Sequence, residues 1–63
     1  MTIYVYHGYK NGKHVATIEG CDADWCLRFK RWFYHNWHTC PSLRAAKATW
    51  RRIDGLGTRW KPH

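Results

Sequence analysis

Hydrophobic residues recur with a helical period between residues 43 and 53. Four apolar positions fall at i, i+3, i+7 and i+10, namely Leu43, Ala46, Trp50 and Ile53. Ser42 offers a side-chain oxygen to the free backbone N–H groups at the start of such a helix. Asp54-Gly55 supplies a stop signal, because glycine accepts the left-handed conformation at a helix end. The pattern predicts one short amphipathic helix over residues 43–53.

A row of cations lies beside the apolar face of this helix. Arg44, Lys47 and Arg51 recur at i, i+3 and i+7, and Arg52 adds a charge further round. The helix therefore packs by one side and presents cations by another. We expect this basic face to be the binding surface.

Residues 2–19 alternate in the way that is typical of a β-hairpin. Asn11-Gly12 is a strong signal for a type I′ turn, because both turn positions need a positive φ. A two-residue loop here pairs Val5 with Ile18. The expected core face then holds Ile3, Val5, Ala16 and Ile18, and the outward face holds Tyr4, Tyr6, Val15, Thr17 and Glu19. The outward Tyr4 and Tyr6 either stack nucleic acid bases, cover a helix or fill a cross-strand pair.

A second helical pattern runs through residues 23–37. Its apolar face consists of Trp25, Cys26, Phe29, Trp32, Phe33 and Trp37, which we expect in the core. Asp22 is the expected N-cap, and Pro41 ends the segment by disfavouring a helical conformation at Cys40. On the opposite face, Leu27 and Tyr34 form a smaller apolar strip that contacts either the last helix or a partner.

The end of the chain is open to two interpretations. Residues 58–61 either add an edge strand to the hairpin or form a basic tail held in place by Trp60. The predicted fold is α+β, with an N-terminal antiparallel β-hairpin packed on two α-helices. A short C-terminal edge strand would complete the order β-β-α-α-β. The 63 residues are expected to form a single domain, 1–63.

Composition adds aromatic bulk and an uneven charge. Five Trp, four Tyr and two Phe supply the apolar area that a chain this short needs for a core. The net charge of +7 is concentrated, since residues 1–27 sum to −1 and residues 28–63 sum to +8. A positive field of this kind favours nucleic acid, anionic lipid or an acidic protein surface.

The sequence also bears on location. Its apolar runs are shorter than the ~18–20 residues of a membrane span, and we see no basic and then apolar signal segment. Three cysteines are few and odd in number, which argues against a disulfide framework. We therefore expect a cytoplasmic protein that does not contact membranes.

Cysteine and histidine raise the question of a zinc site. The candidate ligands are Cys21, Cys26, His38 and Cys40, with His35 as a further nitrogen donor. If residues 23–37 form one helix, Cys26 and Cys40 stand about 20 Å apart at ~1.5 Å per residue, which is too far for one ion. We therefore expect no metal and no other cofactor.

Catalytic arrangements are not evident in the sequence. A pair such as Cys40 with His38 has no third group to orient it. The four Asp and Glu residues form no recognisable acid/base pair. We expect a binding protein that is not an enzyme.

Nucleic acid phosphates are the expected partner of the basic residues. The candidate contacts are Arg28, Lys30, Arg31, Arg44, Lys47, Arg51, Arg52, Arg59 and Lys61, with aromatic contacts from Tyr4, Tyr6 and Tyr34. A helix-turn-helix arrangement, with residues 43–53 in the major groove, is a less economical hypothesis because Arg44 alone stands early enough to read bases.

A protein partner is the alternative. Small phage- or plasmid-encoded inhibitors and adaptors, such as anti-CRISPR-like counter-defence proteins, have this size and style. In that interpretation the basic and aromatic surface docks on an acidic or nucleic-acid-binding site of a host protein complex, with Tyr and Arg as anchors. The sequence does not separate this hypothesis from direct nucleic acid binding.

Overall fold

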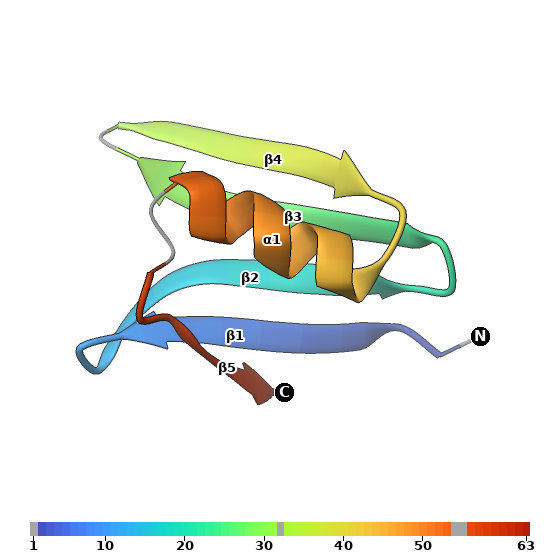
Figure 1. Ribbon diagram of the computed structural model, residues 1–63, viewed down its shortest axis with the longest axis horizontal. Helices are drawn as coiled ribbons and strands as arrows, with labels where there is room; N and C mark the ends of the chain where they lie inside the picture. Colours follow the sequence, from blue (N-terminus) through green and yellow to red (C-terminus); the bar gives the residue numbers. More distant parts are fainter. Residues whose placement is uncertain (1, 32, 54–55) are drawn as a thin grey trace.

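Five antiparallel strands and a helix make up the fold of the described residues. The computed structural model describes residues 2–31, 33–53 and 56–63. Its elements are β1 (Tyr4–Lys10), β2 (Lys13–Cys21), β3 (Asp24–Arg31), β4 (Tyr34–Cys40), α1 (Leu43–Ile53) and β5 (Arg59–Pro62). The strands form one sheet in the order β4-β3-β2-β1-β5, and α1 lies across one face of it (Figure 1). In the described part of the chain, no helix is long and apolar enough to cross a membrane.

The turn between β1 and β2 follows the sequence prediction. Asn11 and Gly12 both have positive φ, 54° and 79°, as the type I′ geometry requires. Lys10 pairs with Lys13 and Tyr9 with His14, which is the register of a two-residue loop. The predicted N-terminal hairpin is therefore present.

A β-bulge then changes the register of this hairpin. Gly8 pairs with Ala16 while the next residue, Tyr9, pairs with His14, so Val15 is an extra residue in β2. Beyond the bulge every pair is shifted by one, and a shift of one residue exchanges the faces of a strand. The prediction that Val5 pairs with Ile18 is therefore wrong.

The bulge decides which residues of β1 face the helix. Tyr6 pairs with Ile18, and Tyr4 pairs with Gly20, so the two tyrosines lie on the face that α1 covers. The expected outward position of Tyr4 and Tyr6 is wrong, as is the expected core position of Val5. Tyr4 and Tyr6 instead pack beside Trp25, with ring centroids 6.4 and 6.3 Å from its ring.

The predicted helix over residues 23–37 is also wrong, because this segment forms the β3–β4 hairpin. Trp25, Leu27 and Phe29 alternate with polar residues and point to the α1 side, a period of two rather than 3.6. Aromatic residues also favour strands. Asp22 is not a helix cap but lies in the β2–β3 turn with a φ of 52°.

Two aromatic residues expected in the core are on the surface for the same reason. Trp37 is 66% exposed and Phe33 is 89% exposed. Trp32 lies outside the described residues. The fold is thus a five-stranded sheet with a single described helix, and not a hairpin packed on two helices.

The helix over residues 43–53 is confirmed with its predicted bounds and cap. The Ser42 Oγ accepts a hydrogen bond of 3.0 Å from the backbone N–H of Ala45, the third residue of the helix. Ala46 and Trp50 are buried, while Leu43 and Ile53 pack at the edge of the core. The expected Asp54-Gly55 stop lies outside the described residues.

The core lies between α1 and the strands β2, β3 and β4. The buried hydrophobic residues are Ala16, Ile18, Trp25, Leu27, Cys40, Ala46 and Trp50. Both buried indoles donate a hydrogen bond of 2.9 Å, Trp25 to the carbonyl oxygen of Asp22 and Trp50 to the hydroxyl of Thr58. These bonds fix the orientation of the largest side chains in the core.

The C-terminal segment forms the edge strand that was one of its two predicted states. β5 pairs antiparallel with β1, and Gly8 lies opposite Trp60. A Cβ at Gly8 would lie 2.8 Å from the Trp60 ring, so glycine is what leaves room for the indole beside β1. Trp60 is thereby held at the border of the core next to α1.

Candidate nucleic-acid interface

The structure distributes seven of the nine predicted phosphate-binding cations over two separate surfaces. Arg44, Lys47 and Arg51 line a groove between α1 and the segment that leads into β5. By strand pairing, Arg28 and Lys30 of β3 and Arg59 and Lys61 of β5 belong to the sheet face opposite α1. The cations that the sequence groups as one set of phosphate contacts therefore do not form one connected patch, because the sheet separates Arg28 from the cations of α1.

The first surface, which we call the helix groove, has a volume of about 490 Å³. Its walls also include Trp50, Thr58 and Trp60. None of the described residues that line it is acidic. Three cations thus face one hollow in which no described carboxylate neutralises them.

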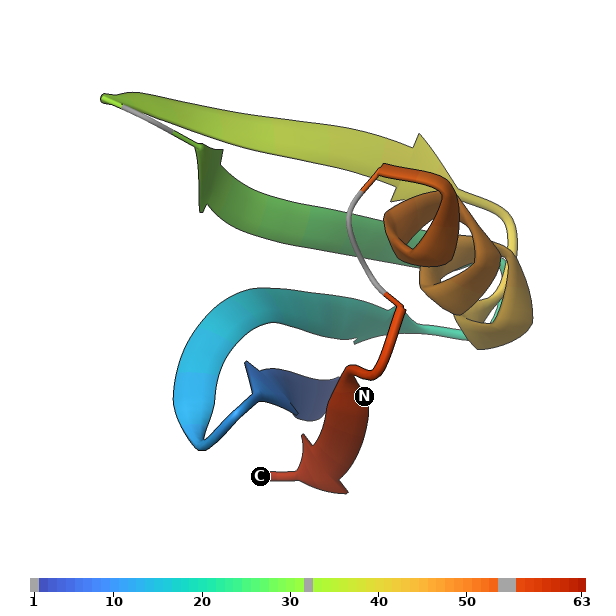
Figure 2. The ribbon, with the colours of Figure 1, turned by 60° about the vertical axis from the view of Figure 1, so that its left-hand side comes forward.

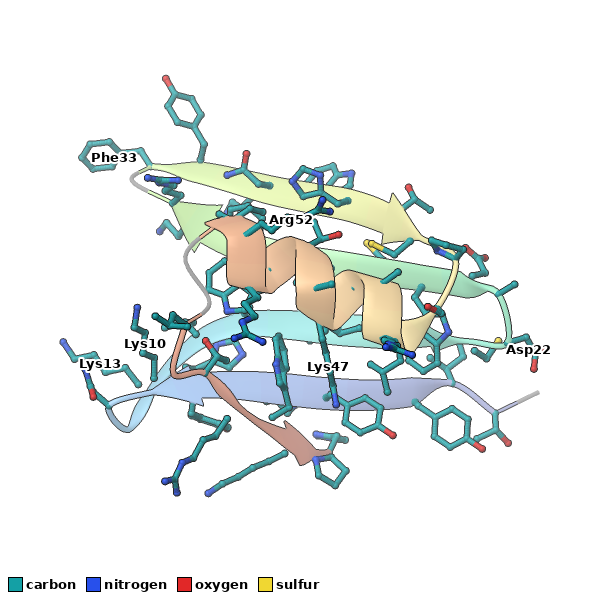
Figure 3. All side chains as sticks on the ribbon, viewed as in Figure 1. Lys10, Lys13, Asp22, Phe33, Lys47 and Arg52 are labelled. Carbon is teal, nitrogen blue, oxygen red and sulfur yellow. The ribbon has the colours of Figure 1, made fainter. Side chains whose placement is uncertain are left out.

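Lys47 shows how this groove is built. Its Nζ lies 5.6 Å from the centre of the Tyr6 ring, a cation–π contact. In Figure 3 the Lys47 side chain runs from α1 across the sheet toward β1. Because the bulge places Tyr6 on this side of the sheet, its ring contacts Lys47 and does not form a separate stacking surface.

Arg52 and Arg31 lie apart from the groove. Arg52 is exposed on the last turn of α1 and is not among the groove residues. Arg31 is exposed at the end of β3, opposite Tyr34. Tyr34 is 74% exposed and stands beside Phe33 at the tip of the β3–β4 hairpin, so these aromatic rings are accessible to a partner.

The second surface is the open sheet face, the face that no described element covers (Figure 2). Its strand residues include Val5, His7, Tyr9, Thr17, Glu19, Cys26, Arg28, Lys30, His35, Trp37, Thr39, Arg59 and Lys61. Glu19 forms an ion pair of 2.8 Å with Arg28, and both side chains are partly exposed. A pair of this kind contributes little to stability, but it removes part of the positive charge of Arg28.

Histidines gather on the open sheet face because of the bulge. His14 pairs with Tyr9, and its Nε2 lies 2.8 Å from the Thr17 hydroxyl. The His7 ring approaches the same hydroxyl at 3.5 Å and lies 3.1 Å from the Nδ1 of His63 through its Nε2. The three imidazoles form one polar row across β2, β1 and the end of the chain.

The candidate zinc ligands do not converge. Cys26 points to the open sheet face, whereas His38 and Cys40 pair with Leu27 and Trp25 and belong to the α1 side. His38 stacks on Phe29 with ring centroids 5.7 Å apart. Across residues 2–31, 33–53 and 56–63, no three His, Cys, Asp or Glu side chains form a group that could hold a metal ion.

Trp37 is a residue of the candidate interface that sequence reasoning missed. Trp37 was assigned to a helix core, yet it lies on the open sheet face opposite Arg28. The available signal was the alternation of polar and apolar residues in β3, where Arg28 and Lys30 are two residues apart, because a period of two predicts a strand and not a helix.

No family model, curated protein or solved structure matches this chain.

Proposed function

We propose that the protein binds nucleic acid and that the helix groove holds the phosphate backbone. The observation that carries this proposal is the convergence of Arg44, Lys47 and Arg51 on one groove without a described acidic neighbour. Arginine suits this role because its planar guanidinium donates two parallel hydrogen bonds to a phosphate.

The spacing of the cations fits a backbone that runs along α1. At ~1.5 Å rise per residue, Arg44 and Lys47 are about 4.5 Å apart along the helix axis, and Lys47 and Arg51 about 6 Å. A nucleic acid strand is a continuous line of negative charge. We therefore favour contacts to the backbone without strong sequence choice.

The helix-turn-helix hypothesis loses its basis. Its first helix would have been residues 23–37, which form β3 and β4. α1 also packs on the sheet through Ala46 and Trp50. The part of α1 that does not pack on the sheet is therefore better suited to form a groove wall than to enter the major groove.

The number of groove cations sets the expected salt dependence. Three phosphate contacts give a slope of about −2.7 in the plot of log K against log salt. Affinity should therefore fall about 40-fold between 50 and 200 mM salt. A steeper slope would indicate that cations outside the groove contact the same nucleic acid.

The chain offers a matched pair of variants for the test. Arg51 and Arg52 are neighbours on the last turn of α1, and Arg51 lines the groove whereas Arg52 does not. Arg51→Glu and Arg52→Glu change the net charge equally. Fluorescence anisotropy with a labelled 20-base-pair duplex should show a loss of at least 10-fold for Arg51→Glu and a clearly smaller loss for Arg52→Glu.

Two results would contradict the proposal. Equal losses for the two variants would mean that the net charge, and not the groove, causes binding. Absence of wild-type binding at 50 mM salt would favour an acidic protein partner instead.

For an acidic protein partner, the exposed Phe33 and Tyr34 become the expected anchors, since aromatic residues dominate interface energetics. A pull-down from nuclease-treated lysate should then lose its retained protein with Phe33→Ser.

A further inference from the structure

The sheet opens at one end between β2 and β3. The β2–β3 ladder stops at the pair Ala16 and Phe29, whereas the β3–β4 ladder continues to Arg31 and Tyr34. Figure 2 shows β2 curving away from β3 at this end. The bulge at Val15 lies at the same place, and bulges bend the strand that carries them.

A pocket of about 550 Å³ occupies this opening, and we call it the strand-end pocket. This volume lies within the roughly 300–1,000 Å³ of small-molecule sites. The residues that line it are His14, Val15, Ala16, Thr17, Arg28, Phe29, Lys30, His35, Asn36, Trp37 and Trp50. They come from β2, β3, β4 and α1, so the pocket is a product of the tertiary fold.

Aromatic rings form the apolar part of the strand-end pocket. Phe29 and Trp50 pack with ring centroids 5.1 Å apart, and the hydrogen bond to Thr58 fixes the Trp50 indole. Trp37 stands on the open sheet face with 66% of its surface exposed. A large indole on a strand exposes a flat ring to solvent, which a planar ligand can cover.

Polar and cationic groups surround these rings. Asn36 donates a hydrogen bond of 3.2 Å to the carbonyl oxygen of Tyr34, which orients its amide and uses one of its N–H groups. Lys30 is exposed at the pocket, and Arg28 is half exposed. No carboxylate belongs to the described lining. The site therefore joins a stacking platform to positive charge, of which Glu19 neutralises the Arg28 part through its ion pair of 2.8 Å and Lys30 supplies the rest.

We infer that the strand-end pocket takes one unpaired nucleobase of a single-stranded nucleic acid. Trp37 stacks on the base, and Lys30 contacts the phosphate beside it. Aromatic stacking with neighbouring cations is the usual way in which proteins hold single strands. A base within a duplex is covered by its neighbours and does not reach such a pocket. This inference rests on the proposed function in that the ligand is nucleic acid, but it concerns a different surface.

The test compares single strands with a duplex. Fluorescence anisotropy at 50 mM salt is measured with labelled dT12, rU12 and a 12-base-pair DNA duplex. Trp37→Ala is the test variant. Phe33→Ala is its matched control, because Phe33 is an exposed aromatic residue of the same hairpin outside the pocket. Lys30→Glu tests the pocket without changing a tryptophan.

We expect Trp37→Ala to weaken dT12 or rU12 binding on the order of 10-fold, as loss of one stacked base does. Duplex binding should stay within about twofold. Phe33→Ala should leave all three ligands unchanged, and Lys30→Glu should weaken the single strands more than the duplex. The strand that responds identifies the sugar that the pocket accepts.

Three results would overturn the inference. In the first, neither Trp37→Ala nor Phe33→Ala changes the affinity for dT12 or rU12, while the duplex still binds. This result would reject the pocket inference and leave the proposed function standing. Another is an equal loss for single strands and duplex, which would place Trp37 in a general backbone contact. The third is that the wild type binds none of the three ligands, which ends the proposed function as well. If Trp37→Ala does not fold, Lys30→Glu decides alone by the same comparison.

Discussion

Gly8 lies in β1 directly under Trp60 of β5, and one added methyl group should separate the two strands. A Cβ at this position would lie 2.8 and 2.9 Å from two carbons of the Trp60 ring, and 2.9 Å from the Thr58 methyl carbon. All three distances are far inside normal packing distance. The ring packs against the core and forms a wall of the helix groove, so any withdrawal would disturb both contacts.

The magnitude follows from two opposing terms. Overpacking by one methyl group costs about 1–3 kcal/mol, whereas replacing glycine by alanine in a strand gains about 0.5–1 kcal/mol. We expect Gly8→Ala to lower the free energy of unfolding by about 1–2 kcal/mol. A chain of this length has a total stability of roughly 3–9 kcal/mol, so the loss is large.

Urea unfolding followed by tryptophan fluorescence measures this change. The melting temperature should fall by about 4–8 °C for each kcal/mol. Trp60→Leu removes the obstructing ring, so Gly8→Ala should cost clearly less in that background, which a double-mutant cycle detects. If the proposed function holds, Gly8→Ala should also lower the affinity for nucleic acid, because Trp60 is a wall of the helix groove. A Gly8→Ala protein as stable as the wild type, or an equal cost in both backgrounds, would refute this account of the β1–β5 contact.

Two further predictions concern single side chains. Ser42→Ala removes the acceptor for the Ala45 N–H and should lower the free energy of unfolding, measured by thermal unfolding, by about 1 kcal/mol. Ser42→Asp caps a helix equally well and should keep the wild-type stability. An equal loss of stability in both variants would argue against capping. Burial raises the pKa of the Cys26 thiol above its ordinary value, against the opposing charge of Arg28, so the folded protein holds less Cys26 thiolate at pH 8 than an unfolded chain does. Peptide mapping after iodoacetamide treatment should show slower alkylation of Cys26 in buffer than in urea, and an equal or faster rate in buffer would contradict this.

The segments that the sequence predicts well are those determined locally. Ser42 and the four apolar positions of residues 43–53 define α1 without reference to the rest of the chain. Asn11 and Gly12 define the first turn in the same way. The row of Arg44, Lys47 and Arg51 follows from the helix period, and the structure confirms that these cations share one surface.

The segments that fail depend on nonlocal pairing. Residues 23–37 carry enough aromatic residues to satisfy a period of two and a period of 3.6 together, and the partners β2 and α1 decide between them. The bulge at Val15 has no clear local signal, yet it exchanges the two faces of β1. The helix groove needs Trp60 and the strand-end pocket needs the end of the β2–β3 ladder, so neither is visible before the sheet is assembled.

The position of β5 beside β1 has a consequence for the order of assembly. Pairing of Gly8 with Trp60 joins segments that are far apart in the chain, and closing so long a loop is entropically slower than forming the local hairpins. The hairpins β1–β2 and β3–β4 and the helix each have nearby partners in sequence. The proposed affinity for phosphate should therefore appear late during refolding, after most secondary structure has formed. A ligand bound in the helix groove should in turn slow the release of the final strand.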